Sequence, residues 1–270
     1  MSRLIALLTD FGHTDTYVAQ MKAVLLRMCP TCELLDLTHG VPPQRVRSGA
    51  YLLVSATPYL PDGTIVVAVV DPGVGTERRA VAVQGVRHTY LAPDNGLLCL
   101  ALREDPPQHA VVLDNPRYHL PNVSATFHGR DLFAPCAAHI ANGVPLQQLG
   151  SPIAPDTLQP LPDIEPEFGG DAIQCRPLHT DHFGNVVFNL CYEAFRAWAG
   201  DLGNSVRVRL KGAPGEPLTL PLVRTFGEVR WGEPLAYWGS NGYLEVAING
   251  GSAAQQLGIT DETVIAIERG

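Results

Sequence analysis

Apolar runs and helical repeats alternate along the first half of the chain. Short apolar runs predict strands, and apolar positions in the segment 14–28 recur at the three- and four-residue spacing of a helix. Strands alternating with helices imply a largely parallel sheet with helices on both faces, while 80–83 and 89–91 look like a hairpin pair. The predicted strands are 4–8, 32–37, 64–70, 80–83, 89–91 and 110–113, and the predicted helices are 14–28, 46–56, 96–102 and 129–141.

The pattern changes after residue 150. Five prolines fall between Ser151 and Gly170, where few apolar positions are periodic, and this composition is typical of a linker. Pro221 makes the later strand 218–222 an edge strand, because proline lacks the amide that a central strand needs. Short strands are predicted at 172–175, 186–190, 206–210, 218–222, 243–248 and 264–267, with one helix at 192–198. We therefore predict an α/β domain at 1–152, a linker at 153–170 and a smaller, mostly antiparallel β domain at 171–270.

Composition narrows the possible partners. Apolar residues make up 46% of the chain and aromatic residues 7%, so the core must be mainly aliphatic. The net charge of -8 argues against non-specific nucleic-acid binding, which needs clustered cations. No apolar run approaches the roughly 18 residues of a membrane span, and the run 4–8 is too short for a signal peptide core. We expect no nucleic-acid partner, no membrane partner and a cytoplasmic location.

Cys29 and Cys32 form a CxxC motif. A zinc site would need a second pair of ligands, and no CxxC or HxxxH partner is present in the sequence. A redox pair would be expected where a helix begins after a strand, because the helix N-terminus lowers a thiol pKa. Here the motif follows a predicted helix and precedes a strand. The pattern favours an ordinary turn, and we predict neither a metal nor a cofactor.

Two aspartates follow predicted strands of the first domain. The run 64–70 ends in Asp71, and a Pro/Gly-rich turn then leads to Arg78 and Arg79. Ligands of open parallel sheets bind at the carboxyl ends of strands, so this turn is a candidate site. It lacks the spacing and the following helix of a phosphate-binding loop. Asp10, after the first strand, can accept hydrogen bonds from ribose hydroxyls or cap the next helix, and spacing alone does not decide between them.

Other candidate residues lie at a helix start and in turns of the second domain. His128 opens the predicted helix 129–141, whose partial positive charge should keep the imidazole largely neutral. Taken alone, its position favours a surface capping residue over a functional one. The turn 181–185 and the segment 239–253 carry side chains that can pair with an ammonium group, stack on a base or bind its edge. Each could also be an ordinary turn.

Six segments, in this order, resemble the S-adenosylmethionine (SAM) hydroxide adenosyltransferase family. These enzymes are also called adenosine-forming SAM hydrolases and are related to the fluorinase and the chlorinase. The resemblance implies a Rossmann-like N-terminal α/β domain and a C-terminal β domain. It also implies a homotrimer that binds SAM, as substrate, between the N-terminal domain of one subunit and the C-terminal domain of its neighbour. The matching segments are Thr9–Gly12, Asp71–Arg78, Ala92–Gly96, Thr126–Asp131, His182–Asn185 and Ser240–Ser252.

The resemblance also implies a reaction and roles for residues. Water or hydroxide would attack C5′ of SAM in an SN2 step, giving adenosine and L-methionine. The family's Asp–Arg–His set maps onto Asp71, Arg78 and His128, and Asp10 falls where the ribose hydroxyls bind. The remaining implied substrate-binding residues are Asn95, then Asp181, Phe183, Asn185 and Ser240 for the methionine end and the adenosine, and Glu245 and Asn249 near the adenine.

Two alternatives to hydrolysis remain open. The fluorinase has Tyr where Asp71 stands and Ser where Gly129 stands, and it carries an insertion before the segment matching 92–96 that this chain lacks. A carboxylate beside the reacting carbon would repel an incoming halide by about 1 kcal/mol or more, so halide transfer is disfavoured. The second alternative is a non-catalytic sensor of SAM or adenosine. Such a sensor would have no need of a buried Asp–Arg–His set.

Overall fold

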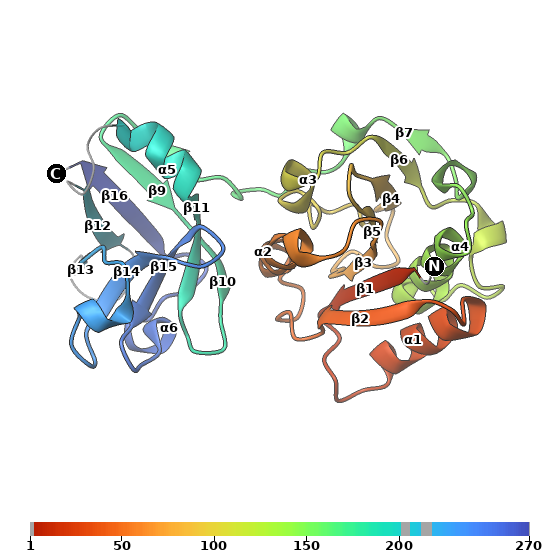
Figure 1. Cartoon of the computed structure of the whole chain (residues 1–270), viewed down its shortest axis with the longest axis horizontal. Coiled ribbons are helices and arrows are strands. Elements are labelled where there is room, and N and C mark those ends of the chain that lie inside the picture. The colour runs from red at the N-terminus through yellow and green to blue at the C-terminus, as the bar shows by residue number, and fades with distance from the viewer. Residues whose placement is uncertain (1–2, 201–205, 212–217, 270) are drawn as a thin grey trace. The chain divides into compact units, whose positions relative to one another are not determined.

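A computed structural model describes residues 3–200, 206–211 and 218–269 of the chain. The chain divides into two units, Met1–Leu161 and Pro162–Gly270 (Figure 1). Residues 153–161 of the predicted linker thus belong to the first unit and residues 162–170 to the second. The domain limits 1–152, 153–170 and 171–270 themselves stay a prediction.

The first unit is built on a seven-stranded sheet with the strand order β2-β1-β3-β5-β4-β6-β7. Neighbouring strands from β2 to β5 are parallel, whereas β4 pairs antiparallel with β5 and β6, and β7 pairs antiparallel with β6. The largely parallel sheet and the hairpin pair are therefore confirmed. The strands are β1 (Leu4–Thr9), β2 (Glu33–Thr38), β3 (Ile65–Val69), β4 (Ala80–Gln84), β5 (Thr89–Pro93), β6 (His109–Val112) and β7 (Pro152–Ile153).

Helices cover both faces of this sheet, as predicted. The helices α1 (Tyr17–Met28) and α4 (Ala134–Ala141) lie on the opposite side of the sheet from α2 (Val46–Ala56) and α3 (Ala101–Glu104) (Figure 1). In β1, Ile5 and Leu7 pack into the core with α1 and α4, and Ala6 and Leu8 pack into the core with α2. Because both faces of the central strands β1 and β3 are buried, these strands are continuous apolar runs, whereas the edge strand β2 is largely exposed and carries charged residues.

Three helix boundaries differ from the prediction. The first helix begins at Tyr17 rather than at residue 14, and α3 lies later than the predicted 96–102. The predicted helix 129–141 begins as a π-helix, Gly129–Phe133, which continues into α4. The apolar period cannot distinguish these two helix types over a single turn. Short π-helical turns are found frequently at functional sites.

The second unit consists of two antiparallel sheets, which confirms the predicted β character. Their orders are β13-β12-β16-β9-β8 and β10-β11-β15-β14, and β13 ends before Pro221 at a sheet edge, as predicted. The sequence did not predict β8, β10, β14 or α6, of which β8 has two residues and β10 and α6 have four each. The elements are β8 (Glu167–Phe168), β9 (Ala172–Cys175), β10 (Pro177–Thr180), β11 (Val186–Cys191), α5 (Tyr192–Ala199), β12 (Val206–Lys211), β13 (Leu218–Leu220), β14 (Pro234–Trp238), β15 (Tyr243–Ile248), α6 (Ala253–Gln256) and β16 (Val264–Arg269).

The sheet of the first unit has a topological switch point between β1 and β3. The chain leaves β1 for β2 on one side and then crosses to β3 on the other side of β1. Thr9 lies opposite Val69 in the strand register, so Asp10 and Asp71 follow adjacent strand ends. Ligands of open α/β sheets bind in the crevice outside the carboxyl ends of strands at such a point. Within the described residues, no helix has the length and hydrophobicity to span a membrane.

Candidate active site

Asp71, Arg78 and His128 form one hydrogen-bonded cluster. Nε of Arg78 lies 3.0 Å and 2.9 Å from the two carboxylate oxygens of Asp71, and Nη2 of Arg78 also donates to Asp71 Oδ2. The same Nη2 lies 2.7 Å from Nδ1 of His128, 50 positions further along the chain. The Asp71 and Arg78 side chains are only 5% and 11% exposed. This burial weakens solvent screening and strengthens the attraction between their charges.

The Pro/Gly-rich turn after β3 returns Arg78 to Asp71. The turn is closed by hydrogen bonds from the Val74 amide to the Asp71 carbonyl and from the Thr76 amide to the Gly73 carbonyl. Gly75 has φ of +79°, and a Cβ there would lie 2.6 Å from the carbonyl oxygen of Ala125. Only glycine therefore fits at this position without displacing the neighbouring loop.

The arginine determines which nitrogen of His128 carries a proton. A guanidinium group has donors and no acceptor, so Nδ1 of His128 accepts the hydrogen bond from Arg78. The neutral ring then carries its proton on Nε2. Burial, followed by the charge of Arg78, lowers the pKa of His128 below its ordinary value. The imidazole is thus a neutral group that donates from Nε2.

A cavity of about 310 Å³ lies beside this cluster. The rings of Phe11, Tyr17 and Phe127 form part of its wall, with centroids 5.2 to 6.0 Å apart. Asp71 and His128 also line it, together with Asp10. The cavity therefore combines an apolar aromatic side with the carboxylate and imidazole of the cluster.

Asp10 is held at this cavity by a backbone amide. Its Oδ2 accepts a hydrogen bond of 2.8 Å from the amide of Gln44, a residue with φ of +65°. Burial raises the pKa of Asp10, and the charge of Asp71 raises it further. Gln44 also lines the cavity, and the sequence offered no signal for it, since its position follows from a left-handed backbone conformation.

Asn95 acts within the fold rather than at the cavity wall. Its Nδ2 donates to the carbonyl of Val70 at 2.9 Å, and its Oδ1 accepts from the amide of Leu97 at 3.2 Å. The Nδ2 bond fixes the chain directly before Asp71, and the Oδ1 bond fixes the turn that carries Asn95 itself. Its predicted contact with substrate stays a prediction.

Asp181, Phe183 and Asn185 lie together in the β10–β11 turn of the second unit. Oδ1 of Asp181 accepts from the amides of Phe183 and Asn185 at 2.9 and 2.8 Å, and Oδ2 accepts from Nδ2 of Asn185 at 2.9 Å. The Asp181 carboxylate thus organises its own turn. The Phe183 side chain remains 74% exposed, so its ring has a face available for stacking.

Ser240, Glu245 and Asn249 occupy different environments in the second unit. Ser240 is exposed in the β14–β15 turn, and among described residues no hydrogen bond links it to the Asp181 turn. Glu245 is buried, accepts a hydrogen bond from the Tyr237 hydroxyl and has a pKa raised by burial. Asn249 donates to the carbonyls of Phe226 and Val229 at 3.1 and 3.0 Å. Glu245 and Asn249 therefore already have protein partners.

Comparison with known proteins places this chain in a family. A family model for the SAM hydroxide adenosyltransferase N-terminal domain matches residues 5–150, and one for the C-terminal domain of the same family matches residues 176–266. The chain belongs to the SAM hydroxide adenosyltransferase family. The resemblance seen in the sequence segments is thereby confirmed.

Individual relatives extend over nearly the whole chain. A protein of Thermus thermophilus named (R)-S-adenosyl-L-methionine hydrolase is 46% identical over 96% of this chain and 97% of its own length. A fluorinase of Nocardia brasiliensis is 31% identical, covering 93% of this chain and 92% of that protein. The crystal structure of an uncharacterized conserved protein from Thermotoga maritima is 34% identical, with a TM-score of 0.86 over 97% of this chain and 99% of that one.

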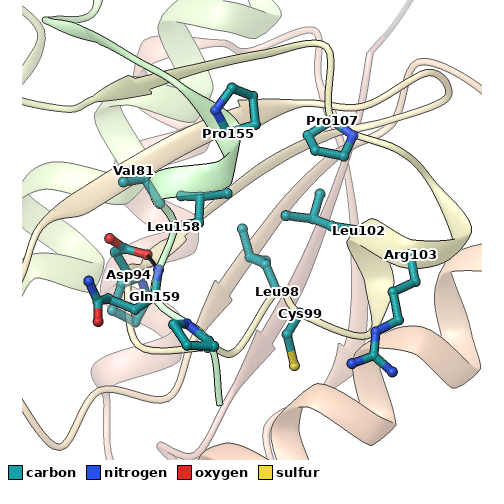
Figure 2. A pocket seen from close by; sticks show the side chains of 13 residues that line it. Val81, Asp94, Leu98, Cys99, Leu102, Arg103, Pro107, Pro155, Leu158 and Gln159 are labelled. Atoms are coloured by element: carbon teal, nitrogen blue, oxygen red, sulfur yellow. Dashed lines mark hydrogen bonds between the residues drawn. The ribbon is translucent and has the colours of Figure 1, made fainter.

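A second cavity in this family member, of about 220 Å³, has a different character (Figure 2). Figure 2 shows the side chains of Leu98, Leu102 and Leu158 along it, with Asp94 beside Gln159. The Asp94 carboxylate accepts hydrogen bonds from Arg79 Nε at 2.7 Å and from the backbone amide of Gln159 at 2.8 Å. The residues that line this cavity include no histidine, so it lacks the carboxylate–imidazole grouping of the first.

Asp131 is a polar residue beside the cluster to which sequence reasoning gave no role. Its side chain is 1% exposed and accepts from Arg130 Nε at 2.6 Å and from the Ser124 amide at 2.8 Å. The bond from the Ser124 amide closes the loop that carries Phe127 and His128. The sequence did offer one signal for this residue. Asp131 is a charged residue that directly follows Arg130 within the otherwise apolar predicted helix 129–141.

The described residues contain no group of three His, Cys, Asp or Glu side chains arranged to hold a metal ion. Cys29 and Cys32 are buried free thiols. Burial, with a smaller contribution from Cys29, raises the pKa of Cys32 to about 11. The Cys32 amide donates to the Cys29 carbonyl at 3.1 Å, so the CxxC motif forms a turn, as predicted, and the raised pKa of Cys32 disfavours its thiolate.

Proposed function

We propose that this chain hydrolyses SAM to adenosine and L-methionine by attack of water or hydroxide on C5′. The observation that carries the proposal is the Asp71–Arg78–His128 cluster, whose Asp71 and His128 side chains line a cavity at the switch point of the sheet. The 46% identical relative named (R)-S-adenosyl-L-methionine hydrolase supports it. The sulfonium of SAM already makes methionine a good leaving group. The enzyme therefore mainly has to position and polarise the nucleophile.

Each member of the cluster has a distinct task in this mechanism. Arg78 remains protonated, holds Asp71 as an anion and stabilises negative charge on the attacking oxygen. His128, with its proton on Nε2, donates a hydrogen bond to that oxygen and orients it. Asp71 accepts the proton of the water. As the O–C5′ bond forms, the C5′–S bond breaks, its electron pair stays on the methionine sulfur, and the proton passes from Asp71 to solvent.

Substrate binding is assigned to both units. Asp10 lies near Asp71 on the cavity wall and would accept the ribose hydroxyls. The residues Asp181, Phe183, Asn185, Ser240, Glu245 and Asn249 would act from a neighbouring subunit of a homotrimer, and the exposed ring of Phe183 supports this role.

Light scattering tests the homotrimer and should give three times the chain mass of 29.1 kDa. We further expect a reaction without metal or cofactor, in the cytoplasm.

Product analysis separates this proposal from the two alternatives. The protein is incubated with SAM in H₂¹⁸O, with and without fluoride or chloride, and the products are identified by mass spectrometry. Adenosine labelled at its 5′ oxygen, together with unlabelled methionine, is the expected result. A 5′-halo-adenosine would show that the chain is a halogenase, as its fluorinase relative is named. Unchanged SAM with measurable binding would identify a sensor.

A further inference from the structure

A buried histidine outside the cavity contacts the strand end that carries Asp10. His39 follows β2, and its side chain is 0% exposed. Its Nδ1 lies 2.8 Å from Oγ1 of Thr9, and its Nε2 lies 3.1 Å from Oδ1 of Asp36. Thr9 is the fully buried last residue of β1 and directly precedes Asp10. His39 does not line the active-site cavity, so it has no direct route to substrate.

His39 also holds the backbone on the far side of Asp10. Its carbonyl accepts a hydrogen bond of 2.8 Å from the amide of Gly12. Oγ1 of Thr9, which contacts the His39 ring, accepts a further hydrogen bond of 3.2 Å from the amide of Phe11. The turn that presents Asp10 is therefore fixed before and after that residue by the same histidine.

The partners of His39 determine the direction of these hydrogen bonds. Asp36 is an anion that also contacts Lys22 Nζ at 2.5 Å, and its charge favours the ring proton on Nε2. The 3.1 Å contact between Nε2 and Asp36 Oδ1 is an ion-pair contact that lacks the alignment of a hydrogen bond. Nδ1 then accepts from the Thr9 hydroxyl, and the oxygen of Thr9 stays available to the Phe11 amide. The ring of His13 packs against His39 at 5.2 Å. Burial lowers the pKa of His39, which keeps the ring neutral as this arrangement requires.

We propose that His39 is a positioning residue, which holds Asp10 in its substrate-binding orientation through the hydroxyl of Thr9. The proposal rests on the proposed function in one respect, the binding of ribose hydroxyls by Asp10. Small displacements of a binding group have large effects on affinity and rate, because hydrogen bonds require close distances and alignment. The His39–Thr9 bond sets that alignment without contacting the ligand.

Two substitutions separate the two sides of the ring. The side-chain amide of Asn lies near the position of Nδ1, and that of Gln lies near the position of Nε2. His39→Asn therefore keeps a partner for Thr9, whereas His39→Gln keeps a partner for Asp36. We expect His39→Gln to raise KM for SAM about tenfold with kcat changed less than about threefold, and His39→Asn to stay within about threefold of wild type in both. Thr9→Val should reproduce His39→Gln, and Thr9→Ser should retain wild-type KM.

A comparison of two ligands, with and without ribose hydroxyls, distinguishes a loss of Asp10 positioning from a general structural effect of the substitution. Adenosine carries the ribose hydroxyls, and 2′,3′-dideoxyadenosine does not. Titration calorimetry should show that His39→Gln weakens adenosine binding about tenfold and leaves binding of the dideoxynucleoside unchanged. An equal loss for both ligands, or an equal rise of KM in the Asn and Gln variants, would overturn the positioning role.

Hydrogen exchange tests the positioning role without any ligand. The amide of Phe11, which donates to Oγ1 of Thr9, should exchange faster in His39→Gln than in His39→Asn, because only the former loses the contact between the ring position and Thr9. Equal exchange in the two variants contradicts the proposal. A wild-type protein that binds neither SAM nor adenosine would overturn the proposed function instead, and the exchange rates would still decide whether His39 fixes the turn.

Discussion

Arg78 and Arg79 are neighbours in the sequence, and each pairs with an aspartate that follows a different strand of the same sheet. Arg78 Nε lies 2.9 Å from Oδ2 of Asp71, and Arg79 Nε lies 2.7 Å from Oδ2 of Asp94. Both carboxylates are almost completely buried, at 5% and 3% exposure. The two ion pairs are therefore nearly equivalent in residue type, pairing and burial of the carboxylate, although the Arg79 side chain is 30% exposed and that of Arg78 is 11% exposed.

The two pairs differ in what else they contact. Arg78 donates to a neutral histidine, and Asp71 lies on the wall of the first cavity. Arg79 donates to the carbonyl of Thr157, and the other oxygen of Asp94 accepts from a backbone amide. These backbone partners occupy hydrogen-bonding groups of Arg79 and Asp94, and they connect the segment 154–160 to the sheet. An Asp–Arg pair can take part in a reaction only where some of its hydrogen-bonding groups face a cavity large enough for a ligand.

Removing each negative charge in turn is the strongest test of this contrast. Asp71→Asn should lower kcat for SAM hydrolysis about 10³-fold, because the amide cannot accept the proton of the water, while adenosine binding stays measurable. Asp94→Asn should destabilise the protein by about 3 kcal/mol, since Arg79 would lose its buried counter-charge, with kcat nearly unchanged. Steady-state kinetics and thermal unfolding measure both. Similar kcat values for the two variants would remove the distinction between the pairs.

The arginines can be compared by the same logic. Arg78→Lys should lower kcat about 10²-fold, because an ammonium group cannot bridge the Asp71 carboxylate and the His128 ring as the planar guanidinium does. Arg79→Lys should affect the unfolding temperature and leave kcat within about twofold. Product formation assayed well below both unfolding temperatures gives the comparison. A larger kcat loss in Arg79→Lys than in Arg78→Lys would reverse the assignment of roles.

The sequence predicted one of these two pairs more completely than the other. The buried run before Asp71 and the turn before Arg78 identified a candidate site, since charged residues at a parallel strand end meet at one sheet edge. The contact with His128 came only from the family resemblance, because spacing does not show which distant residues meet. Arg79 was visible beside Arg78, but its pairing with Asp94 depends on the hairpin register of β4 and β5.

Other features of the site had no sequence signal, for identifiable physical reasons. Gln44 reaches Asp10 through a left-handed backbone conformation that glutamine rarely adopts, and propensities therefore argue against it. His39 lies after a strand in a polar string, where a surface position is the ordinary expectation. The π-helix at Gly129–Phe133 has the same apolar pattern as an α-helix over so short a length. Tertiary contacts determine all three.

The turn between Asp71 and Arg78 should be intolerant of a side chain. Gly75→Ala should destabilise the first unit by about 2 kcal/mol, because its left-handed φ disfavours alanine and the Cβ would contact the Ala125 carbonyl. Gly63→Ala is a matched control, since Gly63 has φ of +81° with no atom within 4 Å of the added Cβ. This control should cost about 1 kcal/mol in chemical unfolding. Equal costs would show that the approach to Ala125 does not constrain the turn.

The pH dependence of turnover distinguishes the Asp71–Arg78 pair, which contacts the titratable His128, from the Asp94–Arg79 pair. Burial and Arg78 lower the pKa of His128, so the neutral ring persists as the pH falls through 6.5 and is protonated only below that value. Protonated His128 cannot accept from Arg78, so kcat should fall as the pH passes down through the lowered pKa, by up to tenfold per unit. His128→Asn keeps an acceptor near Nδ1 and removes this acid limb, leaving a lower kcat that is flat between about pH 5 and 6.5. Asp94→Asn should keep the wild-type limb. A profile for His128→Asn with the wild-type inflection would assign the acid limb to another group.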